Sequence, residues 1–262
     1  MVKKRIIFTL LFENDSFFLS RNFRLQKIGN FEWLKRNYDF SLIANSVDEI
    51  ILLNVARGEP KVNHFCEIIK KFTKECFIPI SAGGKISSLE IAKKYIQSGA
   101  DKLVINSNLF NESLLNKISK NFGEQCIIGS LDYLNENKDF SFYVKNGNSR
   151  INLKINKIFK LLSKLPIGEV LLNSIDMDGT GNGFDFSILK HIPKNFRKPI
   201  IYAGGAGNYK HLMEALKIKK IDSISTAAPR GKELTLTAAL ACLPLSPKTF
   251  AINSDAALIT FG

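Results

Sequence analysis

The alternation of short apolar runs with amphipathic segments limits the folds open to this chain more than any other feature. Eight runs are expected to form strands: 5–11, 49–54, 78–82, 102–106, 126–131, 169–174, 199–203 and 223–226. Segments of helical periodicity lie between most of them: 65–76, 88–98, 113–121, 154–165 and 208–218. Strands that alternate with helices predict a parallel sheet with crossover helices. Since 262 residues suit eight such units, we predict a single (β/α)8 TIM barrel over residues 1–240, with a divergent last helix or a tail over 241–262.

The two halves of the chain share features at one spacing, which indicates an internal duplication. Ala82-Gly83-Gly84 ends the third predicted strand, and Ala203-Gly204-Gly205 ends the seventh, 121 residues later. Asp101, before the fourth strand, and Asp222, before the eighth, have the same spacing. The first and fifth strands also superpose at this shift. These matches predict a barrel made of two half-barrels of common origin.

The glycine turns are candidate phosphate sites. In barrels of this class the active site lies at the carboxyl ends of the strands, where glycine turns and helix N-termini hold phosphates. Gly204 and Gly205 follow the seventh strand directly, and glycine lets backbone N–H groups approach an anion closely. Gly83 and Gly84 repeat the motif after the third strand, where Lys85 either adds a positive charge or blocks the approach. The alternative is two tight turns without a ligand; two sites would suit a substrate with a phosphate at each end.

Polar residues at other strand ends are candidates to hold such a substrate or to react with it. Asn106 and Ser107 follow the fourth strand, where they either bind a phosphate or cap the next helix. Asp132 follows the fifth strand, and a partly desolvated carboxylate at the barrel mouth can act as general acid or base. The alternative for Asp132 is a loop residue that caps a turn. Asp178 either orients substrate hydroxyls or forms an Asx-turn with Gly179.

Composition disfavours several other classes of protein. The net charge is +13, but the lysines are spread through the predicted helices, so we do not expect nucleic-acid binding. No apolar run reaches the roughly 20 residues that a membrane span requires. The apolar stretch near the N-terminus is too short for a signal peptide, so we expect a cytoplasmic protein. The four cysteines lack metal-ligand spacing, and we expect neither a metal nor a cofactor.

Taken in order, these motifs resemble the cyclase subunit of imidazole glycerol phosphate synthase over residues 4–232. The shared stretches are 4–7, 83–84, 98–102, 106–107, 122–123, 132, 171–180 and 203–207. The run from Asn173 to Thr180 is especially specific. The resemblance implies that Asn173, Asp178 and Gly179 contribute to the site for a phosphorylated small-molecule substrate. In that family, ammonia passes through the barrel and reacts with a ribulosyl bisphosphate nucleotide.

The resemblance also implies a partner, a class I glutaminase subunit that docks at the amino-terminal end of the barrel and supplies the ammonia. Four residues match the charged ring at the tunnel entrance of the family: Arg5, Glu49, Lys102 and Glu169. Each lies at or beside the start of a predicted strand, and Asp101 falls on the same docking face. The alternative is a ring of charges that merely plugs the barrel floor by mutual pairing.

The chain departs from the family pattern at the reaction end. The family uses two aspartates as general acid and base; Asp132 retains one of them, whereas Leu11 stands at the position of the other. Loss of one such group typically costs a factor of about 100 to 10,000 in rate. Further replacements of family residues are Asn54 for an aspartate, Leu19 for a lysine, Lys85 for a glycine and Ala228 for a phosphate-holding serine.

A retained entrance ring with an altered reaction end resembles paralogues that work with a glutaminase-like subunit in surface-sugar biosynthesis. In them, ammonia serves the amidation of a sugar acetamido group by a third protein. Our leading hypothesis is therefore a cyclase-type subunit that channels ammonia for amidation of a surface sugar. Two alternatives stay open: a genuine cyclase of histidine biosynthesis that relies on Asp132, and a non-catalytic scaffold that activates a glutaminase.

Overall fold

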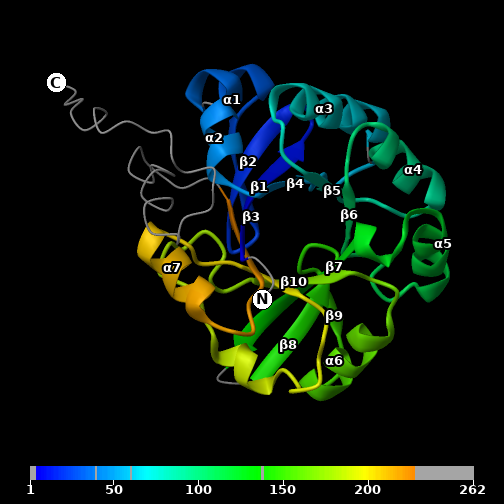
Figure 1. The fold of residues 1–262 in the computed structure, drawn as a ribbon, viewed down its shortest axis with the longest axis vertical. Helices are drawn as coiled ribbons and strands as arrows, with labels where there is room; N and C mark the ends of the chain where they lie inside the picture. The colour runs from blue at the N-terminus through cyan, green and yellow to red at the C-terminus, as the bar shows by residue number, and fades with distance from the viewer. Residues whose placement is uncertain (1–3, 39, 60, 137–138, 228–262) are drawn as a thin grey trace.

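Eight parallel strands close into a barrel in the computed structural model, which describes residues 4–38, 40–59, 61–136 and 139–227. The strands follow one another around the barrel: β1 (Arg5–Glu13), β4 (Glu49–Asn54), β5 (Ile80–Gly83), β6 (Lys102–Ile105), β7 (Ile127–Glu136), β10 (Glu169–Ser174), β11 (Ile200–Ala203) and β12 (Ser223–Ala227). β12 pairs with β1 and closes the ring (Figure 1). The predicted (β/α)8 barrel is confirmed, while the predicted helix or tail over 241–262 lies outside the described residues.

The barrel strands are apolar on both faces because each face is buried. Ile7, Ile51, Val104, Ile128 and Leu171 belong to a small cluster of buried residues that is separate from the main core. Their immediate strand neighbours, such as Ile6 and Leu52, belong to the main core instead. Side chains alternate between the two faces of a strand. The small cluster therefore fills the barrel interior, and the larger one packs between the strands and the helices around them.

Helices surround the barrel (Figure 1): α1 (Phe31–Asn37), α2 (Phe40–Ser46), α3 (Val62–Glu75), α4 (Leu89–Gln97), α5 (Glu112–Phe122), α6 (Ile155–Lys164) and α7 (Tyr209–Lys217). Two short 3-10 helices, η1 (Glu124–Cys126) and η2 (Ser187–His191), lie before β7 and β11. The side chains of Ser88 and Asn208 accept hydrogen bonds from the first turns of α4 and α7, which sets where these helices begin. Within the described residues, no helix has the length and apolarity needed to cross a membrane.

Two β-hairpins extend the barrel over segments for which no strand or helix was predicted from the sequence. The pair β2 (Ser16–Arg21) and β3 (Arg24–Gly29) continues from β1, and β8 (Asp139–Val144) and β9 (Ser149–Ile151) continue from β7. The predicted ends of the first and fifth strands, at residues 11 and 131, are therefore wrong, because both strands run on into antiparallel pairs. The two hairpins grow from corresponding strands of the two half-barrels.

The half-barrel repeat is present, with a register that differs from the predicted one at the glycine turns. Asp101 Oδ2 accepts a hydrogen bond from Ile80 N at 2.8 Å, and Asp222 Oδ2 accepts one from Ile200 N at 2.9 Å. Gly84 (φ +91°) packs on the backbone of Asn54 at the end of β4, and Gly204 (φ +96°) packs on Ser174 at the end of β10. Gly84 thus corresponds to Gly204, one residue away from the match that the sequence suggested.

This register makes Lys85 the counterpart of Gly205. Both residues have positive φ angles, +61° for Lys85 and +107° for Gly205. A side chain in this region of the backbone is strained, since Cβ approaches the following carbonyl oxygen. The loop after β5 therefore retains the shape of its glycine-rich counterpart while it presents a lysine.

Gly84→Ala should destabilise the protein by roughly 2–4 kcal/mol, because the new methyl group would overlap the Asn54 backbone and the φ angle is unfavourable for alanine. Gly58→Ala is the matched control, since a Cβ there would meet nothing within 4 Å. Urea unfolding of both variants measures the difference. Equal stability of the two would contradict the close packing of this turn.

Candidate functional site

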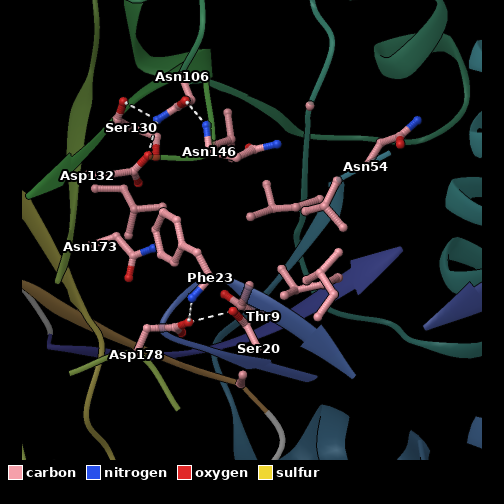
Figure 2. Close-up of a pocket in the computed structure, with 18 of the residues that line it drawn as sticks. Thr9, Ser20, Phe23, Asn54, Asn106, Ser130, Asp132, Asn146, Asn173 and Asp178 are labelled. Atoms are coloured by element: carbon pink, nitrogen blue, oxygen red, sulfur yellow. Dashed lines mark hydrogen bonds between the residues drawn. The ribbon is translucent and has the colours of Figure 1, made fainter. Parts of the chain in front are cut away.

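A hollow opens at the carboxyl ends of the barrel strands, and we call it the mouth. Figure 2 shows Asn106, Ser130, Asp132, Asn173 and Asp178 around it, the first four from β6, β7 and β10 or the residues that directly follow them. Leu11 and Thr9 of β1 also line it. Parallel strands bring their carboxyl ends to one rim, so side chains more than a hundred residues apart in the sequence meet here.

Asp132 is the most perturbed carboxylate of the mouth. It is 4% exposed, and its Oδ2 accepts a hydrogen bond from Asn106 Nδ2 at 3.1 Å. Burial raises the pKa of Asp132 to about 7, against the opposing effect of hydrogen bonds from neighbours such as Asn106. A carboxyl group with this pKa exchanges protons readily near neutral pH, which is what a general acid or base requires. Because it lies inside β7, it is not the turn-capping loop residue of the alternative interpretation.

Leu11 lies across the barrel from Asp132. It pairs in register with Leu53 of β4, and both leucines line the mouth. Asp132 pairs in register with Asn173 of β10. Since β1 and β7 stand four strands apart in a barrel of eight, a carboxylate at position 11 would face Asp132 across the mouth. The leucine leaves that side without a group able to transfer a proton.

Asp178 makes its side-chain contacts with the β2–β3 hairpin. Its carboxylate accepts hydrogen bonds from Ser20 Oγ and from Phe23 N, the latter at 3.0 Å, rather than closing an Asx-turn with Gly179 (Figure 2). It thereby fixes the β2–β3 hairpin over the mouth, and burial raises its pKa. A role in orienting substrate hydroxyls stays a prediction, since Asp178 also lines the mouth.

Two further hollows flank the mouth and contain the predicted phosphate residues. The glycine hollow includes Gly179, Gly204, Gly205 and Arg21, and it shares Ser20 with the mouth. Gly204 and Gly205 have positive φ angles there. A glycine turn of this kind can direct backbone N–H groups toward an anion.

The second, the lysine hollow, includes Gly84, Lys85, Asn106, Ser107 and Lys145, and it shares Gly84 and Asn106 with the mouth. Gly83 was predicted to join this group, but it lies within β5 and packs against Val104 and Leu53. The helix-cap alternative for Asn106 and Ser107 is wrong, because the side chain of Asn111 caps α5. The lysines give this hollow more positive charge than the sequence motif alone suggested.

The predicted charged ring closes the opposite end of the barrel. Arg5 Nη1 lies 3.0 Å from Glu49 Oε2, and Arg5 also pairs with Glu169. Lys102 Nζ lies 3.1 Å from Glu49 Oε2 and 2.8 Å from Glu169 Oε1. Each cation therefore contacts both carboxylates in a closed cycle of four side chains. Each of the four is the first residue of its strand, β1, β4, β6 or β10, so the ring lies at the amino-terminal rim.

Two additional hydrogen bonds stabilise the partly buried charges of the ring. Ser81 Oγ donates to Glu49, and Arg5 Nε donates to Ser223 Oγ at 2.9 Å. Burial alone would raise the pKa of Glu169, but its hydrogen bonds with Arg5 and Lys102 outweigh burial and lower the pKa. The ring is therefore held in its charged form, and a closed set of pairs is compatible with both a gate and a plug.

Asp101 also lies at the amino-terminal rim, where docking of a partner was predicted. Asp101 is exposed, but its Oδ2 accepts a hydrogen bond from Ile80 N. The carboxylate thus secures the start of β5, and a contact with a partner stays a prediction.

The sequence analysis missed the residues that the hairpins bring to the mouth: Ser20, Phe23, Leu25, Asn146 and Asn148. The ring of Phe23 projects into the mouth beside Asn173 (Figure 2). One signal was available, since Asn146-Gly147 between alternating polar and apolar residues is a strong hairpin motif. Asn22 and Phe23, which also have positive φ angles, form the turn between β2 and β3, and the sequence Asn-Phe gives no such indication.

No group of three or more histidine, cysteine, aspartate or glutamate side chains in the described part of the chain could hold a metal ion. Cys66, Cys76 and Cys126 are free thiols. Burial raises the pKa of the Cys76 thiol to about 11, which makes it unreactive.

Comparison with known proteins assigns the family. The family model described as "Histidine biosynthesis protein" matches residues 39–228. A protein of Parasynechococcus marenigrum, provisionally named imidazole glycerol phosphate synthase subunit hisF2, is 41% identical over 87% of this chain and 85% of its own length. Imidazole glycerol phosphate synthase subunit HisF of Dictyoglomus turgidum is 31% identical over 77% of this chain and 79% of its own.

The subunit HisF of Staphylococcus saprophyticus is 31% identical over 90% of this chain and 94% of its own length. The family model covers most of this chain, and the identity to these relatives extends over most of both chains. The chain belongs to the histidine biosynthesis protein family, among the relatives of the HisF cyclase subunit of imidazole glycerol phosphate synthase.

Proposed function

We propose that this chain is the barrel subunit of a glutaminase-coupled complex, in which ammonia enters through the charged ring and travels to the mouth. The observation that carries the proposal is the closed cycle of Arg5, Glu49, Lys102 and Glu169 at the rim opposite Asp132. A partner docked on that rim would contact the ring directly, so that a change in its pairing can admit ammonia. The interior of the barrel is lined by apolar residues, which favour passage of a neutral molecule over a charged one.

The chemistry at the mouth differs from that of a cyclase with two acid/base carboxylates. Asp132 is poised for proton transfer, but Leu11 faces it across the barrel. A single carboxylate supports one proton transfer at a time, and the second transfer of a cyclisation has no group at position 11. This asymmetry disfavours efficient cyclisation, and we infer that the ammonia serves another acceptor, a surface sugar in the paralogues that the chain resembles.

The direct test of this proposal supplies the complex with the ribulosyl bisphosphate nucleotide and either glutamine or ammonium. We expect turnover reduced by a factor of about 100 to 10,000 relative to a two-aspartate cyclase. Turnover at ordinary cyclase rates would contradict the proposal and favour a genuine cyclase of histidine biosynthesis.

Leu11→Asp should raise cyclase turnover by at least about tenfold, because it restores a carboxylate across from Asp132. Leu161→Asp on α6, a half-buried residue outside the mouth, serves as the control and should leave turnover unchanged. Steady-state formation of imidazole glycerol phosphate measures the effect. An equal, unchanged rate in both variants would show that other changes in the mouth, such as Asn54, limit the reaction.

Lys102→Met should reduce turnover with glutamine more than turnover with ammonium. Glu49 and Glu169 each lose a partner in this variant, so the ring opens or collapses. We expect the residual turnover with glutamine to fall at least fivefold relative to that with added ammonium, which can reach the mouth from solution. Lys70→Met, which removes an exposed pair with Glu67 on α3, is the control and should leave the ratio unchanged. An unchanged ratio in Lys102→Met would mean that the ring is a plug.

Asp132→Asn should stabilise the protein at alkaline pH. The pKa of Asp132 is near 7 in the folded state and near 4 in an unfolded chain. The folded state therefore holds a proton that the unfolded state releases, so this residue's contribution to stability falls as the pH rises from about 4 to about 7. We expect a gain of about 1 kcal/mol or more at pH 8 and a smaller gain at pH 4, by urea unfolding. A gain of the same size at both pH values, as for a surface change, would rule out the buried, protonated carboxyl.

A further inference from the structure

Phe77 is the most exposed large hydrophobic residue in the described part of the chain. It is 91% exposed, whereas the next such residue, Tyr209, is 36% exposed. Phe77 lies in the loop between α3 and β5. In a (β/α)8 barrel, the loops that lead from a helix into the next strand lie at the amino-terminal rim. Phe77 therefore projects from the same rim as the charged ring.

The chain on both sides of Phe77 is fixed to the barrel. Cys76 is buried and has an extended backbone, with φ −122° and ψ 119°, so that neighbouring side chains point to opposite sides. Ile78 packs against the main core, and the carbonyl oxygen of Pro79 accepts a hydrogen bond from Ile50 N at 2.9 Å. The loop thus holds the ring of Phe77 outward, beside the start of β4.

The opposite side of the amino-terminal rim is basic. The segments that precede β11 and β12 carry five basic residues at the rim, which we call the basic half: Lys194, Arg197, Lys198, Lys219 and Lys220. Residues 186–213 and 215–221 contain no aspartate or glutamate. Because β11 stands four strands from β5, the basic half lies across the barrel from Phe77. Figure 1 shows α4 and α7 on opposite sides of the barrel accordingly.

The charges of the basic half are held in place by neutral partners. Lys198 Nζ donates to the carbonyl oxygen of Ile167 at 2.7 Å, and Lys220 Nζ donates to two carbonyl oxygens of η2 and its C-cap at 2.8 and 3.0 Å. A carbonyl oxygen orients an ammonium group but does not cancel its charge. On the side of Phe77, by contrast, the exposed Asp101 and Glu124 are acidic. The rim therefore has an aromatic, acidic side and a basic side.

This surface fits an acidic protein better than other occupants. Aromatic residues are the commonest anchors of protein interfaces, and complementary charge guides a partner into one orientation. A second copy of this chain would bring its own net charge of +13 against the first. An anionic membrane would be attracted to the basic half and repelled by Asp101 and Glu124. The charged ring lies between the two sides, so a protein that covers both sides also covers the ring.

We propose that the glutaminase subunit docks on this rim with Phe77 inserted into an apolar pocket and with acidic side chains over the basic half. The inference rests on the proposed function in naming a glutaminase as the occupant. It goes further, because it makes Phe77 the anchor of the interface and fixes the rotation of the partner about the barrel axis.

Calorimetric titration of the full chain with the glutaminase of the same organism tests the role of Phe77. We expect Phe77→Ala to weaken binding by about tenfold or more, as truncation of a buried aromatic anchor does. Tyr209→Ala is the matched control, because Tyr209 begins α7 at the opposite rim, and it should leave the affinity unchanged. Equal affinities of the Phe77→Ala variant and the unchanged chain would overturn the inference.

Charge reversal tests the basic half. Arg197→Glu combined with Lys219→Glu should slow association by about tenfold or more, and association of the unchanged chain should slow as salt is added. Lys93→Glu combined with Lys117→Glu alters the net charge equally on α4 and α5, where both residues are exposed. This control should slow association by less than about twofold. Equal slowing by the two double variants, or an association rate independent of salt, would overturn the inference.

Sedimentation of the chain alone tests the alternative occupant. We expect a monomer, and a dimer that Phe77→Ala converts into a monomer would show that a second copy covers the rim and would overturn the inference. The two proposals fail separately. A glutaminase that binds the unchanged chain and both sets of rim variants equally would overturn only this inference, whereas a glutaminase that does not bind the unchanged chain would overturn both.

Discussion

Closure of the barrel by the pairing of β12 with β1 is the constraint on which the rest of the structure depends. In a closed parallel barrel, all strands begin at one rim and end at the other. That geometry collects the first residues of β1, β4, β6 and β10 into the charged ring and carries Asp132, Asn106 and Asn173 to the opposite rim. Neither group is local in the sequence, and both exist only because the ring of strands is complete.

The two rims of the barrel shift the pKa values of their buried carboxyl groups in opposite directions. At the amino-terminal rim each of the four side chains of the charged ring has two partners of opposite sign, and pairing outweighs burial for Glu169. At the mouth, Asp132 has neutral hydrogen-bond partners, and burial outweighs them. The first arrangement holds charge in place, whereas the second makes a proton easy to gain and lose near neutral pH. The first property suits the proposed ammonia entrance, and the second suits the proposed proton transfer by Asp132.

The sequence predicted the barrel well because its periodicity reflects burial on both faces of each strand. Glu49–Asn54 and Glu169–Ser174 were predicted to the residue, since charged or polar residues mark the two ends of each apolar run. Strands β2 and β8 carry several apolar residues and could have been predicted from the sequence. Strand β3 was missed because it carries few apolar residues: it reads Arg-Leu-Gln-Lys-Ile-Gly, and half of its residues are exposed. Such a strand is stabilised by pairing with β2, and this tertiary contact cannot be predicted from the local pattern of apolar residues. The correspondence of Lys85 with Gly205 was not predicted either, because only the backbone angles show that a lysine occupies the position of a glycine.

The proposed function requires a glutaminase subunit to bind at the charged rim and to be active there. The direct measurement is glutamate release by the glutaminase of the same organism, followed as this chain is titrated in with no acceptor present. We expect the rate to rise and to saturate at one barrel per glutaminase, and we expect this saturation to be lost in Lys102→Met. A glutaminase rate that does not change at any ratio of the two proteins would contradict it.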